Sequence, residues 1–214
     1  MHPTPDPAFS PITDDRTETR RELAEALSWL MPFHYFYEKD GRALPDFRFL
    51  HGEEVPYPYR SLLVHTNDMT PTLAAFHHSR LYLEVHQRES SETFLMRLVT
   101  LHAAASAAPV EYGAIAIHLG GLPSEVAAAV LVGSKPLGAI LGESGMTYRG
   151  APVAYFSVPA DERIARALRQ QPGEILYGRC NQLLDHDGIV FADIVEILPR
   201  SNESEQWVRD LPPT

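Results

Sequence analysis

The sequence has one cysteine, Cys180, and no long run of apolar residues. A single cysteine cannot form a disulfide within the chain, which fits a reducing compartment. No segment approaches the roughly 20 consecutive apolar residues that span a bilayer. The proline-rich start MHPTPDPAFSPITDD also lacks the apolar stretch of a signal peptide. We therefore expect a cytoplasmic protein that has no membrane partner.

Basic residues are also scarce. The chain has 18 Lys and Arg against 28 Asp and Glu, a formal net charge of -10, and no block of clustered Lys or Arg. Such a surface repels nucleic acid and anionic lipid, so we expect no nucleic-acid partner. A small anionic ligand is still compatible with this charge if a few cations are concentrated inside a pocket.

The motifs of common enzymes and cofactor sites are missing. The chain has no P-loop, no GxGxxG, no CxxC pair and no serine in a nucleophile-elbow pattern. The adjacent His77 and His78 point to different sides of a predicted helix, so they do not indicate a metal site. Cys180 lies within a strand pattern and is interpreted as a buried, unreactive thiol.

Hydrophobic periodicity predicts the secondary structure. Alternating or wholly apolar runs predict strands at 81–87, 92–102, 111–119, 153–159, 174–185 and 188–199. Helical spacing and capping residues, such as Ser124, predict helices at 15–31, 69–78, 122–133, 134–141 and 161–170. Residues 32–58 are expected to be irregular, and Asp187-Gly188 is a hairpin signal.

This order of elements favours an α+β fold. Strands that follow one another through short connections predict an antiparallel sheet of about six strands, with helices covering one face. With no internal repeat and no linker, we expect a single domain over residues 15–200. A flexible tail is expected at 1–14 and a second tail at 201–214.

Arg97 is the most unusual residue of the predicted core. It lies in the strand ETFLMRLVTLH, whose two faces are otherwise apolar. Arginine is almost never fully buried without a partner, because an uncompensated buried charge costs several kcal/mol. The partner is either a ligand or a carboxylate in a structural ion pair, for which Asp193, Glu84 and Glu111 are the candidates.

Two carboxylates lie in the last predicted strand, GIVFADIVEILP. Strand alternation puts Asp193 on one face with Phe191 and Val195, and Glu196 on the opposite face. Only one of the two carboxylates can face the core. Burial without a partner would raise its pKa.

Five stretches, in this order, resemble the chorismate pyruvate-lyase family. They are NDMTPTLAAF, MRLVTL, SKPLG, LYGRCNQL and VEILP, spread over roughly residues 60 to 200. The resemblance implies a six-stranded antiparallel sheet with helical flaps over a buried ligand site. This agrees with the fold class predicted from the pattern.

The resemblance also implies site residues. Arg97 would bind the ring carboxylate of chorismate, and Arg179 would bind its enolpyruvyl carboxylate. The backbone N–H of Leu137 would meet the ring hydroxyl, with Met69 and Thr70 lining the pocket beside it.

The family's acidic residue near the closing proline has two candidates here. Counting back from Pro199 reaches Val195, whereas counting forward from the Asp-Gly turn reaches Asp193, because this hairpin carries one extra residue. We favour Asp193 as the catalytic acid. Glu196 is the second choice, which requires a β-bulge to change the alternation.

The activity implied by the resemblance is the elimination of pyruvate from chorismate to give 4-hydroxybenzoate. Such an aromatising lyase serves quinone biosynthesis or aromatic secondary metabolism. Fixed charges and the exclusion of water suffice for this step, so no metal or organic cofactor is implied. The enzyme is expected to be a monomer or a homodimer.

Two alternatives stay open. The same fold serves enzymes that act on a related cyclic carboxylate, and it serves the non-catalytic effector domains of some transcription regulators. Such regulators usually carry a helix-turn-helix upstream. Only about sixty residues precede the match here; they are acidic and rich in proline, and no basic recognition helix is evident among them.

Overall fold

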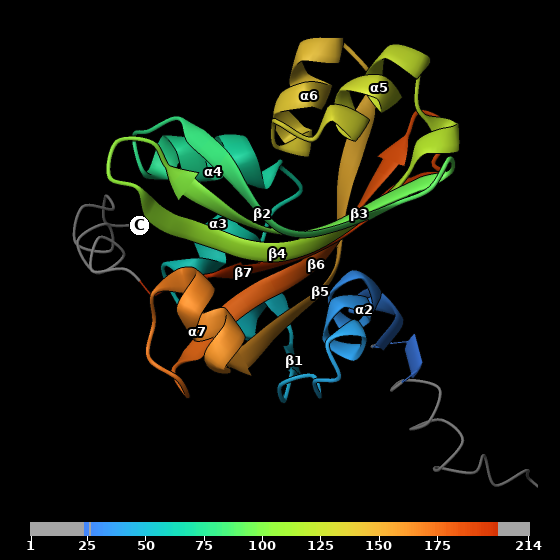
Figure 1. Cartoon of the computed structure of the whole chain (residues 1–214). Coiled ribbons are helices and arrows are strands. Elements are labelled where there is room, and N and C mark those ends of the chain that lie inside the picture. The colour runs from blue at the N-terminus through green and yellow to red at the C-terminus, as the bar shows by residue number, and fades with distance from the viewer. Residues whose placement is uncertain (1–23, 26, 201–214) are drawn as a thin grey trace, which may run out of the picture.

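The computed structural model describes residues 24–25 and 27–200 (Figure 1). The predicted tails at 1–14 and 201–214, and most of the predicted helix 15–31, lie outside the described residues. The limits of the single domain therefore stay a prediction.

Seven strands form one antiparallel sheet in the order β1-β5-β6-β7-β4-β3-β2. The strands are β1 Arg48–Leu50, β2 Leu81–Ser90, β3 Phe94–Ala103, β4 Ala108–His118, β5 Tyr148–Pro159, β6 Ile175–Asp185 and β7 Val190–Leu198. The α+β fold and its antiparallel sheet are confirmed, and the six predicted strands are all present. The seventh, β1, pairs with β5 at the sheet edge and is too short to show alternation.

Six α-helices whose bounds are fully described accompany the sheet. They are α2 Met31–Lys39, α3 Tyr59–Leu63, α4 Met69–Phe76, α5 Ser124–Val132, α6 Leu137–Ser144 and α7 Glu162–Leu168. The last four match predicted helices. Helix α2 contradicts the expectation that 32–58 is irregular: Pro32 occupies its first turn, and Phe33, Phe36 and Tyr37 are buried.

The helices cover both faces of the sheet and not one, as Figure 1 shows. Helices α3 to α6 lie on one face, and α2 and α7 lie on the other. The physical reason is that β3 and β4 are apolar on both faces and are almost wholly buried. A strand of this kind needs a covering layer on each side.

Local signals position the helices. Asp161 caps α7 by accepting a hydrogen bond from the backbone N–H of Ile164 at 2.8 Å. Helix α5 ends at Gly133, which adopts the left-handed conformation typical of a helix end. Ser124, the expected cap of α5, is instead its first residue, after Pro123.

A β-bulge in β7 decides which residues face which layer. Leu183 of β6 pairs with Ala192, but Leu184 pairs with Val190, so Phe191 is an extra residue in β7. Phe191 therefore packs with Ala192 in the apolar cluster under α5 and α6. From Ala192 onward the alternation is regular.

Candidate functional site

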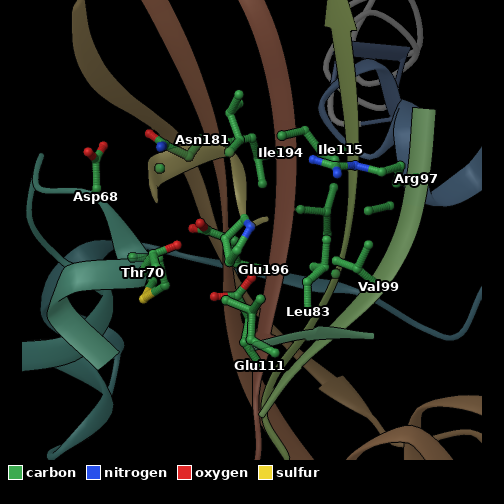
Figure 2. Close-up of a pocket in the computed structure, with 18 of the residues that line it drawn as sticks. Asp68, Thr70, Leu83, Arg97, Val99, Glu111, Ile115, Asn181, Ile194 and Glu196 are labelled. Atoms are coloured by element: carbon green, nitrogen blue, oxygen red, sulfur yellow. The ribbon is translucent and has the colours of Figure 1, made fainter. Parts of the chain in front are cut away.

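A pocket of about 70 Å³ lies between the sheet and the N-terminal ends of α4 and α6. We call it the sheet pocket. Its floor comes from the central strands β3, β4, β7 and β6, and Figure 2 shows the side chains that point into it. The labelled lining residues are Asp68, Thr70, Leu83, Arg97, Val99, Glu111, Ile115, Asn181, Ile194 and Glu196.

Strand register brings distant residues into rows across the floor. Arg97 pairs with Ile115, Ile115 with Ile194, and Ile194 with Asn181. In the next row Gly113 pairs with Glu196. A Cβ on Gly113 would lie 2.2 Å from the carbonyl oxygen of Val195, so this close approach of β4 and β7 requires glycine.

Arg97 is buried in this floor. Its Nε and Nη1 atoms have no hydrogen-bond partner, and it forms no ion pair with any described carboxylate. The structural ion pair expected with Asp193, Glu84 or Glu111 is therefore absent from the described residues. Burial and the neighbouring Arg88 lower the pKa of Arg97 to about 10, which still leaves its guanidinium charged at neutral pH.

Glu111 and Glu196 form the acidic side of the sheet pocket. Burial raises the pKa of Glu111 well above its ordinary value, the charge of Glu196 raises it further, and Arg179 opposes both. Both effects favour the protonated form of Glu111. One oxygen of Glu111, Oε2, has no hydrogen-bond partner. In its protonated form, the Glu111 carboxyl group presents a hydrogen-bond donor where a carboxylate presents only acceptors.

Arg179 is fully engaged by the protein. Its Nε donates to Glu196 Oε2 at 2.5 Å, and its Nη1 donates to the carbonyl oxygen of His65 at 2.9 Å. Nη2 donates to the carbonyl oxygen of Asn67 at 3.2 Å. Arg179 does not line the sheet pocket, so the structure differs from the expectation that it meets a second ligand carboxylate. It anchors the chain segment that leads into α4.

Two helix N-termini converge on the sheet pocket. Met69 and Thr70 begin α4, and Leu137 and Gly138 begin α6, and all four line the pocket. A Cβ on Gly138 would lie 3.3 Å from Thr70 Oγ1, so the two helix ends are in close contact. The first backbone N–H groups of a helix lack partners within it and favour anions. Contact of these residues with a ligand stays a prediction.

Asp193 lies outside the sheet pocket. Its Oδ1 accepts a hydrogen bond from Gln182 Nε2 at 2.9 Å, and its Oδ2 lies 4.0 Å from His118 Nε2. Glu196 faces the sheet pocket instead. This corrects the expectation that Asp193 faces the ligand: counting from the hairpin fails because the bulge at Phe191 shifts the alternation.

Asn181 and Asp68 line the sheet pocket and were not singled out from the sequence. Asn181 Oδ1 is buried without a hydrogen-bond partner. Asp68, at the start of α4, accepts a hydrogen bond from the Tyr148 hydroxyl, which ties α4 to β5. A polar residue two positions after Arg179 in an apolar strand was the available signal for Asn181.

Unpaired buried polar atoms thus gather around one small space. They belong to a cation, a carboxyl group and a side-chain amide, contributed by β3, β4 and β6. Buried polar groups in native proteins are nearly always hydrogen-bonded, so such a cluster is typical of a site that is completed by a ligand or ordered water.

Other classes of site find little support in the described part of the chain. No group of three or more His, Cys, Asp or Glu side chains there is arranged to hold a metal ion. Cys180 is buried, as predicted, and burial raises the pKa of its thiol. No helix within residues 24–25 and 27–200 has the length and apolar character needed to cross a bilayer.

Comparison with known proteins gave matches at the level of structure alone. No family model and no curated protein sequence matches the chain. The structure is similar to PhnF from Mycobacterium smegmatis, with a TM-score of 0.50 and 11% identity over 64% of this chain. The match spans 65% of the length of PhnF.

Two isolated domains are also similar. The effector domain of PhnF gives a TM-score of 0.46 and 11% identity, covering 62% of this chain and 88% of that domain. The ligand-binding domain of a putative GntR-family transcriptional regulator from Bordetella bronchiseptica gives a TM-score of 0.43 and 15% identity. The match covers 55% of this chain and 85% of that domain.

These findings correct the functional expectation. The similar structures named here are PhnF, its effector domain and the ligand-binding domain of a putative regulator, and no chorismate lyase is among them. The assignment as a chorismate lyase that serves quinone biosynthesis is therefore wrong, and the resemblance holds for the fold alone. The engagement of Arg179 agrees with this correction, because the lyase assignment requires Arg179 in the site. Glu196, the second choice for the acid, does line the sheet pocket.

Proposed function

We propose that this domain binds a small anionic molecule in the sheet pocket and acts as a non-catalytic ligand-sensing domain. The observation that carries the proposal is the buried guanidinium of Arg97, which lines the pocket and has no ion-pair partner among the described residues. A carboxylate or phosphate group would supply the missing negative charge through paired N–H···O bonds.

The polarity of the sheet pocket supports one orientation of the ligand. Arg97 lies on one side, and Glu111 and Glu196 lie on the other (Figure 2). An anionic group beside the two glutamates would be repelled by carboxylate charge, whereas a hydroxyl or amino group would find an acceptor in Glu196 and, in the protonated form of Glu111, a donor. The proposed ligand therefore carries an anionic group at one end and a neutral polar group at the other.

The size of the sheet pocket supports a compact ligand. About 70 Å³ is well below the roughly 300 Å³ at the lower end of sites for drug-sized molecules. Because the N-termini of α4 and α6 form the upper wall, occupancy would fix these helices relative to the sheet. The fixed position of these helices would transmit the presence of the ligand to an attached or associated part of a regulator.

Calorimetric titration with acetate, benzoate and inorganic phosphate, three anions that differ in size and charge, tests this proposal. At least one is expected to bind saturably to the wild type, and Arg97→Gln should weaken that binding by at least about tenfold. Arg48→Gln, which changes an exposed arginine on the edge strand β1, serves as the matched control. Binding that is equal in the wild type and Arg97→Gln would contradict the proposal. The bound anion should also be recovered chemically unchanged.

A further inference from the structure

A second pocket, of about 500 Å³, lies on the opposite face of the sheet. We call it the rear pocket. It is enclosed by helix α7, the segment after α2, and strands β2, β3 and β4. We propose that the rear pocket is a second binding site, for a small hydroxylated anion such as a phosphorylated or carboxylated polyol, and that it is independent of the sheet pocket.

The floor of the rear pocket holds buried polar atoms without partners. Tyr112 is fully buried, and its hydroxyl has no hydrogen-bond partner among the described residues. His102 is also buried: its Nε2 meets Glu84 Oε2 at 2.7 Å, while its Nδ1 has no partner. Because a carboxylate only accepts, His102 Nε2 carries a proton and donates it to Glu84, while Nδ1 stays free to bind another group. The floor therefore offers unused hydrogen-bonding capacity.

His86 adds a neutral polar group beside them. Its Nε2 lies 2.7 Å from Thr100 Oγ1, and its ring centroid lies 5.9 Å from that of Tyr112. Burial lowers the pKa of His86, which keeps the ring uncharged at neutral pH. Apart from the Glu84 carboxylate, which pairs with His102, the floor presents uncharged donors and acceptors, which suit hydroxyl groups better than a second charge.

The rim of the rear pocket carries three exposed arginines, Arg42, Arg166 and Arg169. None of them forms an ion pair with a described residue, in a protein whose net charge is -10. Unpaired guanidinium groups gathered at one opening attract a phosphate or carboxylate group. Glu162, also on the rim, is the one acidic lining residue without a described ion-pair partner.

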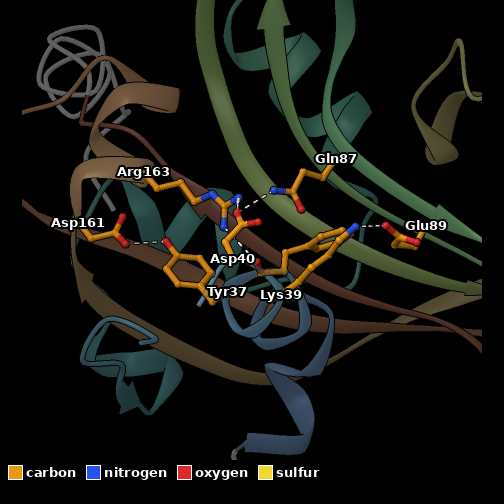
Figure 3. A network of polar contacts seen from close by, with 8 residues as sticks. Tyr37, Lys39, Asp40, Gln87, Glu89, Asp161 and Arg163 are labelled. Atoms are coloured by element: carbon orange, nitrogen blue, oxygen red, sulfur yellow. Dashed lines mark hydrogen bonds and ion pairs between the residues drawn. The ribbon is translucent and has the colours of Figure 1, made fainter. Parts of the chain in front are cut away.

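A polar network holds the wall between floor and rim (Figure 3). Arg163 of α7 pairs with Asp40, and its guanidinium carbon lies 5.1 Å from the centre of the Tyr37 ring. Asp40 also accepts from Gln87 Nε2 at 2.8 Å, and Tyr37 donates to Asp161 at 2.8 Å. Arg163 is thus engaged in joining α2, α7 and β2, and the rim arginines stay available to a ligand.

The arrangement matches a ligand with two kinds of group. Its anionic group would meet the guanidinium groups at the rim, and its hydroxyls would reach Tyr112 and His102 on the floor. A bare anion would use only the rim, and an uncharged polyol would use only the floor. Neither would satisfy both sets of groups.

The test is a residue-resolved NMR titration of the whole chain with sn-glycerol 3-phosphate, which carries a phosphate and two hydroxyl groups. Saturable shifts are expected at the backbone amides of His102, Tyr112 and Arg166. The double variant Arg166→Gln/Arg169→Gln should bind at least about tenfold more weakly. Arg48→Gln, an exposed arginine on β1, should bind as the wild type does.

Tyr112→Phe separates a ligand contact from a structural role. Because the hydroxyl has no partner among the described residues, its removal should leave the unfolding midpoint unchanged or raised, while glycerol phosphate binds more weakly. Shifts confined to residues around Arg97, or equal affinity in the double arginine variant, would overturn the proposal. A third outcome would also overturn the proposal: inorganic phosphate and glycerol phosphate bind with equal affinity, and Tyr112→Phe leaves that affinity unchanged. The site would then recognise the anionic group alone.

Discussion

Arg97 of β3 lies directly opposite Arg88 of β2, and neither guanidinium forms an ion pair with a described carboxylate. Arg88 Nη2 donates to the carbonyl oxygen of Leu131 at 2.7 Å, near the C-terminal end of α5. Two like charges on adjacent strands destabilise the unliganded domain. This pair therefore favours binding of an anion beside Arg97, where the negative charge would relieve the repulsion.

Removing the charge of Arg97 should not destabilise the protein. Arg97→Met keeps an unbranched side chain but removes a buried charge that lacks a partner. We expect the free energy of unfolding in urea to stay equal or rise, by up to about 3 kcal/mol, in the absence of ligand. A loss of about 3 kcal/mol or more would show that a protein carboxylate pairs with Arg97.

Arg179 should behave in the opposite way. It forms a buried ion pair with Glu196, so Arg179→Met leaves a buried carboxylate without its partner. We expect a loss of about 3–5 kcal/mol in the free energy of unfolding. Lys135→Met, which breaks the exposed pair with Glu143, is the control and should cost about 1 kcal/mol or less. A similar small loss for Arg179→Met would contradict its structural role.

Glu111 should make stability fall with rising pH. Its pKa is raised in the folded protein, mainly by burial, so the folded state holds a proton that the unfolded state releases. This contribution is fully present below the ordinary pKa of glutamate and is lost as pH rises towards the pKa of folded Glu111. Glu111→Gln should therefore gain stability relative to the wild type from pH 4 to pH 8. Urea unfolding at several pH values measures this difference, and a constant difference would contradict the assignment.

Asp161 should stabilise α7 through its cap. Its Oδ1 accepts from the N–H of Ile164, and its Oδ2 accepts from the Tyr37 hydroxyl, both at 2.8 Å. Asp161→Ala should lower the free energy of unfolding by about 1–2 kcal/mol or more, because both bonds are lost. Asp161→Asn, which retains an oxygen acceptor for the cap, should lose less. Equal losses in the two variants would show that the negative charge of Asp161 is what matters and not its cap.

The sequence predicted the sheet well because its strands carry strong patterns. β3 and β4 are mostly apolar, and the hairpin between β6 and β7 contains Asp187-Gly188, with Gly188 at a positive φ. Helix α2 was missed because its aromatic and proline residues are poor local signals of a helix. Its stability comes from packing of Phe33 and Phe36 against the sheet, which is a tertiary effect.

Only part of the site could be predicted. A charge within an apolar strand identified Arg97 without any structure. The choice between Asp193 and Glu196 depended on a bulge at Phe191, which has no reliable sequence signal. Arg179 looked available to a ligand because its backbone partners lie 112 to 116 residues earlier in the chain. Long-range contacts of this kind cannot be read from spacing.

The most direct test of the central claim observes the guanidinium of Arg97 itself. In protein labelled with ¹⁵N-arginine, the side-chain signals of Arg97 are identified by their loss in Arg97→Gln. The account predicts that a bound anion, whether acetate, benzoate or phosphate, shifts the Arg97 Nε–H and Nη–H signals and slows their exchange with water. The signals of Arg179 should stay unchanged. An anion that binds without moving the Arg97 signals, or that moves those of Arg179 instead, would contradict the assignment of the sheet pocket as an anion-binding site.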